Sequence, residues 1–144
     1  MTTILLVEDQ VEVRTFTKRL LLRNGYEVIE AESGEAALRS WPDHGARVDL
    51  VITDLSMPGG MDGDTLARQL RAQKPELRVV FTSGYGAYHG IREPRLVEGE
   101  NFIPKPSTAE LMLHTIRFAL SAGVSEANGE AKLEPSLLLA EGRF

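Results

Sequence analysis

The sequence predicts an α/β fold, a doubly wound parallel sheet of five strands with helices on both faces. Short apolar runs alternate along the chain with longer stretches whose apolar residues recur at helical spacing. Leu5 to Val7 in the first of these runs, and Val51 and Ile52 in the third, are continuously apolar, as expected of strands that helices cover on both sides. At 144 residues, the chain is long enough for one such domain and a short tail.

The first strand is predicted over Thr3 to Val7, a run of leucine and β-branched residues. A helix is expected over Gln10 to Arg23, and Asn24-Gly25 is a typical signal for its end. Its apolar residues at helical spacing, expected to face the core, are Val13, Phe16 and Leu20. This part of the chain therefore predicts a strand, a short acidic turn and an amphipathic helix.

The next elements are shorter. Tyr26 to Glu30 predicts the second strand. Ser33 is placed as the N-cap of a helix over Gly34 to Trp41, and Pro42 is expected to end that helix. Asp49 to Thr53 predicts the third strand.

Turn residues separate the elements that follow. The stretch Leu55 to Gly63 contains a proline and three glycines, which favour a loop. A helix over Asp64 to Gln73 is closed by Pro75. Leu77 to Thr82 predicts the fourth strand.

The last strand and helix are expected over Asn101 to Pro104 and Ser107 to Leu120. The helix opens with the capping box Ser107-Thr-Ala-Glu110. A further helix belongs in Gly84 to Gly99, but its glycines and Pro94 oppose one. We expect this segment to be the least ordered part of the domain, with at most two helical turns.

Residues 1–121 are therefore predicted to form one domain, and residues 122–144 a linker and an apolar tail. Ser121 to Pro135 is small, polar and acidic, as in flexible tethers. The tail after it carries the apolar residues Leu137, Leu138, Leu139 and Phe144. The tail could fold back on its own domain, stay disordered, or pack against a second copy. We favour a homodimer, formed through the tail or through the face of Gly84 to Gly99 and the last helix.

Composition excludes several classes of function. The chain has no cysteine, and so no disulfide, thiolate metal site or catalytic thiol. Its apolar runs are too short to span a bilayer, and its N-terminus lacks the basic flank of a signal peptide. The net charge is −5 and the 16 basic residues are scattered, so neither a nucleic acid nor a membrane is an expected partner. We expect a cytoplasmic protein.

The residues that could do chemistry lie where the predicted strands end. They are Glu8, Asp9, Asp54, Thr82, Ser83 and Lys105. Because parallel strands end at one edge of a sheet, these side chains should converge. Clustered carboxylates attract a hard cation such as Mg²⁺, and a carboxylate can be a nucleophile. With a lysine and a hydroxyl to bind phosphoryl oxygens, the pattern predicts a Mg²⁺-dependent phosphoryl-acceptor site.

Each of these residues alone has a plainer explanation. Asp9 could be a solvated turn or a helix cap, Ser83 a turn residue, and Lys105 an ordinary loop lysine. Their joint placement at successive strand ends is what favours a site.

Five segments follow one another along the chain: Ile4-Leu-Leu-Val-Glu8-Asp9, Asp54-Leu-Ser-Met57-Pro58, Met61-Asp62-Gly63, Val80-Phe-Thr-Ser83-Gly84 and Phe102-Ile-Pro-Lys105-Pro106. With this ordered set, the chain resembles the receiver domain of two-component response regulators over about residues 2 to 121. The resemblance implies a flavodoxin-like sheet with strand order 2-1-3-4-5. It also implies a signalling phosphoacceptor rather than an enzyme, with intrinsic autophosphorylation and autodephosphorylation. No output motif follows residue 121, so we expect a stand-alone receiver.

The resemblance assigns roles to individual residues. Asp54 would accept the phosphoryl group and Lys105 would bind it. Mg²⁺ would be held by Asp9, Asp54, the backbone carbonyl of Ser56 and, through a water, Glu8. Ser83 and Phe102 would form a conformational switch, and Lys105-Pro106 would be a cis peptide.

The resemblance implies a phosphodonor as partner, either a sensor histidine kinase or a histidine phosphotransfer protein. It would dock on the first helix, whose exposed residues near the site are expected to be Val11, Arg14, Thr15 and Lys18. The plainer explanation is that Arg14 and Lys18 belong to a solvated face.

Three other functions share parts of this pattern. An aspartyl-phosphate phosphatase usually carries a second Asp two residues after its nucleophile, where this chain has Ser56. A pseudo-receiver, which only binds proteins, usually lacks the acidic pair, the phosphoacceptor or the lysine, and this chain has them all. A flavin-binding protein of this topology needs a phosphate-cradling loop where this chain has Glu8-Asp9-Gln10.

Overall fold

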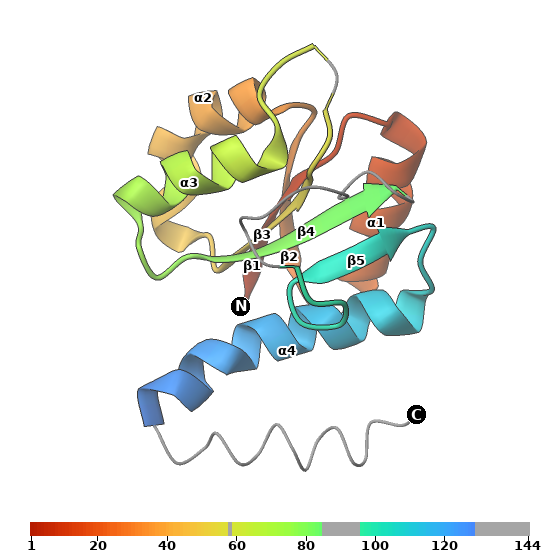
Figure 1. Ribbon diagram of the computed structural model, residues 1–144, viewed down its shortest axis with the longest axis vertical. Coiled ribbons are helices and arrows are strands. Elements are labelled where there is room, and N and C mark those ends of the chain that lie inside the picture. Colours follow the sequence, from red (N-terminus) through yellow and green to blue (C-terminus); the bar gives the residue numbers. More distant parts are fainter. Residues whose placement is uncertain (58, 85–95, 129–144) are drawn as a thin grey trace.

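Five parallel strands form a single sheet in the order β2-β1-β3-β4-β5 (Figure 1). This computed structural model describes residues 1–57, 59–84 and 96–128, with side chains as far as residue 121. The strands are β1 Thr3–Val7, β2 Glu27–Ala31, β3 Leu50–Asp54, β4 Arg78–Gly84 and β5 Phe102–Lys105. The fold class and the strand order expected from the sequence are confirmed.

Helices cover both faces of the sheet, α2 and α3 on one and α1 and α4 on the other (Figure 1). Their bounds are α1 Val11–Arg23, α2 Gly34–His44, α3 Gly63–Gln73 and α4 Ala109–Asn128, and a short 3₁₀ turn, η1, spans Gly45–Arg47. In the part of the chain that is described, no helix is long and apolar enough to cross a membrane.

The two faces hold two separate apolar cores because successive strand residues point to opposite sides. In β1, Leu5 and Val7 pack in the core under α2 and α3, and Ile4 and Leu6 pack in the core under α1 and α4. All of β1 is therefore buried, and the same holds for β3. This burial on both faces explains why Leu5 to Val7 and Val51-Ile52 are continuously apolar in the sequence.

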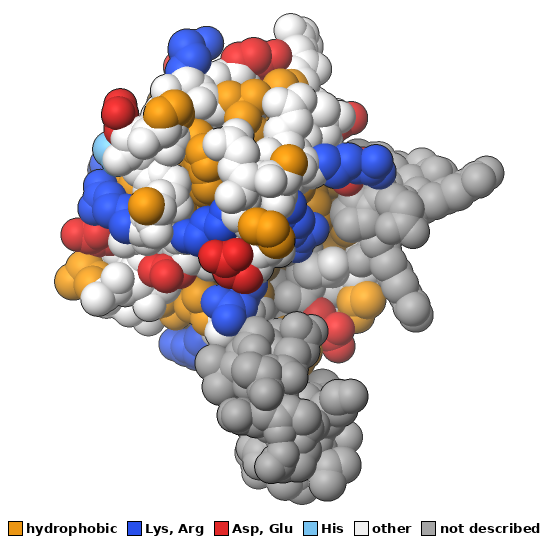
Figure 2. Space-filling view, turned by 90° about the vertical axis from the view of Figure 1, so that its left-hand side faces the viewer, with side chains coloured by type: hydrophobic (Ala, Val, Ile, Leu, Met, Phe, Trp, Pro, Cys, Tyr) orange, Lys and Arg blue, Asp and Glu red, His pale blue; other side chains and the backbone are white. Residues whose placement is uncertain are grey.

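The face that carries α2 and α3 has no concentration of charge of one sign among its described side chains. Figure 2 shows acidic and basic groups interspersed there with polar and apolar ones. This agrees with the scattered basic residues of the sequence.

Several helix boundaries differ from the prediction, among them the end of α2 and the start of α4. Pro42 does not end α2, which continues through it to His44. The proline removes one backbone donor in the last turn, where one lost hydrogen bond is tolerable. The N-cap of α4 is Thr108 rather than Ser107, because the Thr108 hydroxyl accepts a hydrogen bond from the Leu111 backbone at 3.0 Å.

The face of α1 that meets the sheet also differs from the prediction. The buried residues of α1 are Thr17 and Leu21, whereas the Phe16 side chain, expected in the core, is 57% exposed. Thr17 and Leu21 are four residues apart and lie on one face of the helix. Phe16 precedes Thr17 and falls outside that face, so an apolar ring is left at the surface.

The last helix extends beyond its predicted end. It does not stop at Leu120, and α4 runs on to Asn128, so the first residues of the expected tether are helical. The rest of the predicted linker and the apolar tail, residues 129–144, lie outside the described residues. So does most of the segment Gly84 to Gly99, of which residues 85–95 are not described.

Candidate functional site

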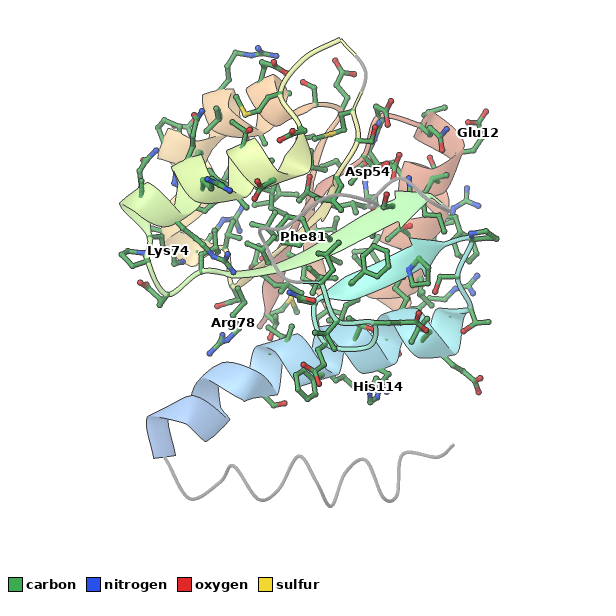
Figure 3. The ribbon with its side chains drawn as sticks, viewed as in Figure 1. Glu12, Asp54, Lys74, Arg78, Phe81 and His114 are labelled. Atoms are coloured by element: carbon green, nitrogen blue, oxygen red, sulfur yellow. The ribbon has the colours of Figure 1, made fainter. Side chains whose placement is uncertain are left out.

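The predicted site residues meet at the carboxyl edge of the sheet. Glu8 follows β1, Asp54 is the last residue of β3, and Lys105 is the last residue of β5. Register brings these ends together, since Asp54 pairs with Thr82 and Gly84 pairs with Lys105. Figure 3 shows Asp54 at this edge, with Arg78, at the start of β4, at the other end of the sheet.

One lysine joins the two buried carboxylates. The Lys105 ammonium lies 2.6 Å from Asp54 Oδ2 and 2.7 Å from Glu8 Oε1. Asp54 is 7% exposed and Glu8 3% exposed, so both charges are largely removed from water. The peptide bond from Lys105 to Pro106 is cis, as the resemblance implied. The ammonium thus supplies the positive charge that two buried carboxylates need.

Backbone groups bind the remaining carboxylate oxygens. The Ser56 backbone N–H donates to Asp54 Oδ1 at 3.1 Å, and the Gln10 backbone N–H donates to Glu8 Oε2 at 3.1 Å. Each carboxylate is therefore held by one backbone donor and by Lys105. This fixes their orientation before any ligand binds.

Burial and ion pairing shift the pKa values of Glu8 and Lys105 at this edge. Burial raises the pKa of Glu8, and the hydrogen bond and charge of Lys105 offset only part of that rise. Burial alone would lower the pKa of Lys105, but its hydrogen bonds to Asp54 and Glu8 outweigh it and raise that pKa. Lys105 therefore stays charged at neutral pH.

The third carboxylate completes an oxygen-rich cluster. Carboxylate oxygens of Glu8, Asp9 and Asp54 all lie within 4.8 Å of one another, and Asp9 is exposed to solvent. Hard divalent cations prefer such oxygen ligands, and Mg²⁺ keeps several waters of its own. The donor set fits Mg²⁺, with Asp9 on the side that water can reach.

Ser83 is buried close to this edge, near the end of β4, and Phe102 is buried at the start of β5, where it pairs with Phe81. Ser83 is fully buried, and its hydroxyl has no hydrogen-bond partner among the described residues. An unsatisfied buried hydroxyl is uncommon and costs free energy. The Phe102 ring is 3% exposed and lies in the core under α2 and α3. The ring is thus already inside the protein.

The residues of α1 predicted as an exposed docking face are only partly exposed. Val11 is 54% exposed, but the Arg14 side chain is 17% exposed. Arg14 donates to the backbone carbonyl of Glu8 at 2.7 Å and lies 3.4 Å from Glu30. Lys18 pairs with Glu30 at 2.7 Å and lowers the pKa of that carboxyl.

Arg14 thus supports the turn that carries Glu8, a role that sequence reasoning missed. A contact with a backbone carbonyl leaves no pattern in the sequence by which to find it. Thr15 is half-buried on the same helix.

A glycine lets α3 approach the site closely. The Asp62 side chain caps α3 by accepting from the Thr65 backbone at 2.8 Å, and the Gly63 backbone donates to the Leu55 carbonyl at 3.0 Å. A Cβ atom on Gly63 would overlap the backbone oxygen of Asp54. Only glycine fits there, which gives a physical reason for the segment Met61-Asp62-Gly63.

Comparisons with known proteins agree with this geometry. The sequence matches the family described as "Response regulator receiver domain" over residues 4–117. It is 39% identical over 115 residues to the sensor kinase CckA of Brucella abortus, covering 80% of this chain and 12% of the kinase. It is 32% identical over 119 residues to the chemotaxis protein CheY of Bacillus subtilis, covering 82% of this chain and 97% of CheY.

A solved structure has the same architecture. The receiver domain from the hybrid histidine kinase CckA superposes with a TM-score of 0.67 at 36% identity, covering 82% of this chain and 98% of that one. The chain therefore spans a small part of the sensor kinase it matches, and nearly all of an isolated receiver domain.

Proposed function

The chain belongs to the response regulator receiver domain family of two-component phosphorelay systems, and on this premise we propose that Asp54 accepts a phosphoryl group from a phosphohistidine. Receivers are signalling phosphoacceptors rather than classical enzymes. The observation that carries the proposal is the Lys105 ammonium, 2.6 Å from Asp54 and 2.7 Å from Glu8 beside a third carboxylate.

The transfer requires an oxygen nucleophile at Asp54. An oxygen of its carboxylate forms a bond to phosphorus as the bond from phosphorus to the donor's imidazole nitrogen breaks, and the electron pair stays on that nitrogen. Lys105 already contacts Asp54, so its ammonium can bind an oxygen of the incoming phosphoryl group. Hydrolysis of the aspartyl phosphate would return the protein to its starting state.

The negative charge of the phosphoryl oxygens also needs a cation on the side of the site where Asp9 lies. The residues that would hold Mg²⁺ are Asp9, Asp54, the backbone carbonyl of Ser56 and, through a water, Glu8. Bound there, Mg²⁺ supplies positive charge that stabilises the transferring phosphoryl group. Ser56, two residues after Asp54, is itself exposed, which suits a backbone ligand.

Phosphorylation would be read out through Ser83 and Phe102. The Ser83 hydroxyl is buried and unsatisfied among the described residues, so a phosphoryl oxygen would give it a strong partner. The Phe102 ring is already buried. Phosphorylation would therefore stabilise this inward ring position over an outward one, a bistable packing change biased by a new charge.

The donor would be a histidine kinase or a phosphotransfer protein, since relatives of the chain include a sensor kinase. We expect it to dock on α1 beside the site, in the cytoplasm, with Val11 and Thr15 as contact residues. Arg14 and Lys18 would contribute charge there while still bound to Glu30.

The assignment is tested with a small phosphodonor. Acetyl phosphate and Mg²⁺ are expected to add the mass of one phosphate to the wild-type chain and none to Asp54→Asn, measured by mass spectrometry. The matched control is Asp43→Asn, an exposed carboxylate near the end of α2, which should keep the adduct. An equal adduct in Asp54→Asn, or an adduct unaffected by chelating Mg²⁺, would contradict the proposal.

A further inference from the structure

A cavity of about 460 Å³ lies between α1 and α4 on the face opposite α2 and α3. Residues that line it include Val13, Phe16 and Thr17 of α1, Ile103 of β5, Pro106, and Met112 of α4. We call it the α1–α4 cavity. Its volume falls in the range of roughly 300–1,000 Å³ typical of sites that bury a small ligand, so it has room for several apolar side chains.

An apolar ring at the protein surface, that of Phe16, lines the cavity. Phe16 is 57% exposed at the edge of the cavity. Glu8 and Lys105 line one end, so the cavity opens beside the acidic edge of the sheet. The cavity therefore offers the apolar tail a place on its own domain, as an alternative to a second copy.

The chain itself carries an apolar segment that can reach this cavity. Met112 lies 16 residues before Asn128 in α4, about 24 Å back along the helix at ~1.5 Å per residue. Leu137 is nine residues beyond Asn128, a span of up to about 30 Å when extended. Gly129 directly follows the helix, where glycine commonly lets a chain reverse its direction.

We propose that the C-terminal segment, residues 136–144, folds back along α4 and places its leucine side chains in the α1–α4 cavity. Those leucines are Leu137, Leu138 and Leu139. The short tether holds the segment at an effective concentration in the millimolar range, so the tail of the same chain is favoured over that of a second copy. The cavity gains apolar contacts with the leucines, and Phe16 is covered.

This contact would regulate the proposed phosphotransfer. A protein phosphodonor that docks on α1 beside Glu8 and Lys105 needs the surface that the tail covers. A small phosphodonor needs only access to Asp54. Docking of the tail therefore slows transfer from a protein and leaves reaction with acetyl phosphate unchanged.

The contact is tested without phosphorylation, on the full chain. Because the chain has no cysteine, Ala140→Cys gives one attachment site for a nitroxide spin label. The label is expected to broaden the NMR signals of Val13, Phe16 and Met112. Leu138→Glu should abolish this broadening, and Leu133→Glu, a matched change outside the leucine run, should leave it. Phe16→Ser should likewise reduce it, and Leu22→Ser, an equally exposed position on α1, should not.

Two outcomes would overturn the proposal. One is no broadening at the cavity, or broadening that Leu138→Glu leaves unchanged. The other is broadening that appears when isotope-labelled chains without the spin label are mixed with unlabelled chains that carry it. That second result would assign the cavity to the tail of another copy.

A second arm rests on the proposed function. If the tail is docked about nine-tenths of the time, Leu138→Glu should raise the phosphotransfer rate from a protein donor about tenfold. The rate from acetyl phosphate should not change. An equal rise with both donors, or none with the protein donor, would refute the regulatory role. Failure of both donors in the wild-type chain would instead count against the proposed function and leave the spin-label result standing.

Discussion

Lys105 is the single side chain on which the charge balance of the acidic edge depends. It contacts two buried carboxylates that have one backbone donor each. Without it, Glu8 and Asp54 would face each other with no cation between them. Breaking a buried ion pair by removing one partner typically costs several kcal/mol.

Lys105→Met is therefore expected to lower the free energy of unfolding by about 3 kcal/mol in EDTA. Added Mg²⁺ should restore much of this loss because it replaces the missing positive charge at the carboxylates. Urea unfolding with and without Mg²⁺ measures both effects. The control is Lys18→Met, whose partly exposed pair with Glu30 is worth no more than about 1 kcal/mol. A loss for Lys105→Met that is the same in EDTA and in Mg²⁺ would contradict this account.

The start of α3 lies against the end of β3, and Gly63 makes this close approach possible. The Cβ atom of an alanine at position 63 would overlap the backbone oxygen of Asp54, so the end of β3 or the start of α3 would have to move. Gly63→Ala is expected to lower the free energy of unfolding by about 2 kcal/mol or more, as in overpacked cores. The same movement should slow phosphorylation of Asp54 by acetyl phosphate.

Gly84, at the end of β4, gives the matched control for Gly63. An added Cβ there would meet no atom of the described residues within 4 Å. Gly84→Ala should therefore change the free energy of unfolding by less than about 0.5 kcal/mol. Equal losses for the two alanine variants would show that the close approach of α3 is not the cause.

The strands were predictable because the sheet is covered on both sides. A run such as Ile4 to Val7 is apolar at every position, and the structure buries all of it. The meeting of Glu8, Asp54 and Lys105 was predictable as well, because parallel strands bring their carboxyl ends to one edge.

The helix details were less predictable because they depend on three-dimensional contacts. Leu20 packs against the core as its helical spacing suggests, but Phe16 lies at the surface, and the buried residues of α1 are Thr17 and Leu21. The contact of Arg14 with the Glu8 carbonyl has no signature in residue type or spacing. The cavity between α1 and α4 arises from how two helices lie on the sheet, which no local pattern reports.

For the whole domain, binding of Mg²⁺ should raise the free energy of unfolding. A ligand present at 100 times its Kd stabilises the folded state by about 2.7 kcal/mol. Wild-type protein should therefore gain resistance to urea as Mg²⁺ is added. Asp9→Asn should lose most of that gain while keeping its stability in EDTA, since Asp9 is exposed.

The control for Asp9 is Glu32→Gln, an exposed carboxylate just after β2 that should retain the full effect of Mg²⁺. Urea midpoints across a Mg²⁺ titration give the apparent affinity of each variant. A full Mg²⁺ effect in Asp9→Asn would remove Asp9 from the metal site.

The strand order also fits the direction in which a ribosome makes the chain. After β1 emerges, β2 joins one of its edges and β3 the other, and then β4 and β5 each add to the edge just formed. No strand has to insert between two that are already paired. The lysine that balances the acidic edge lies on the last strand to be synthesised. A nascent chain that stops short of β5 carries Glu8 and Asp54 without their cation, so the site becomes electrically complete only when translation of the domain is nearly finished.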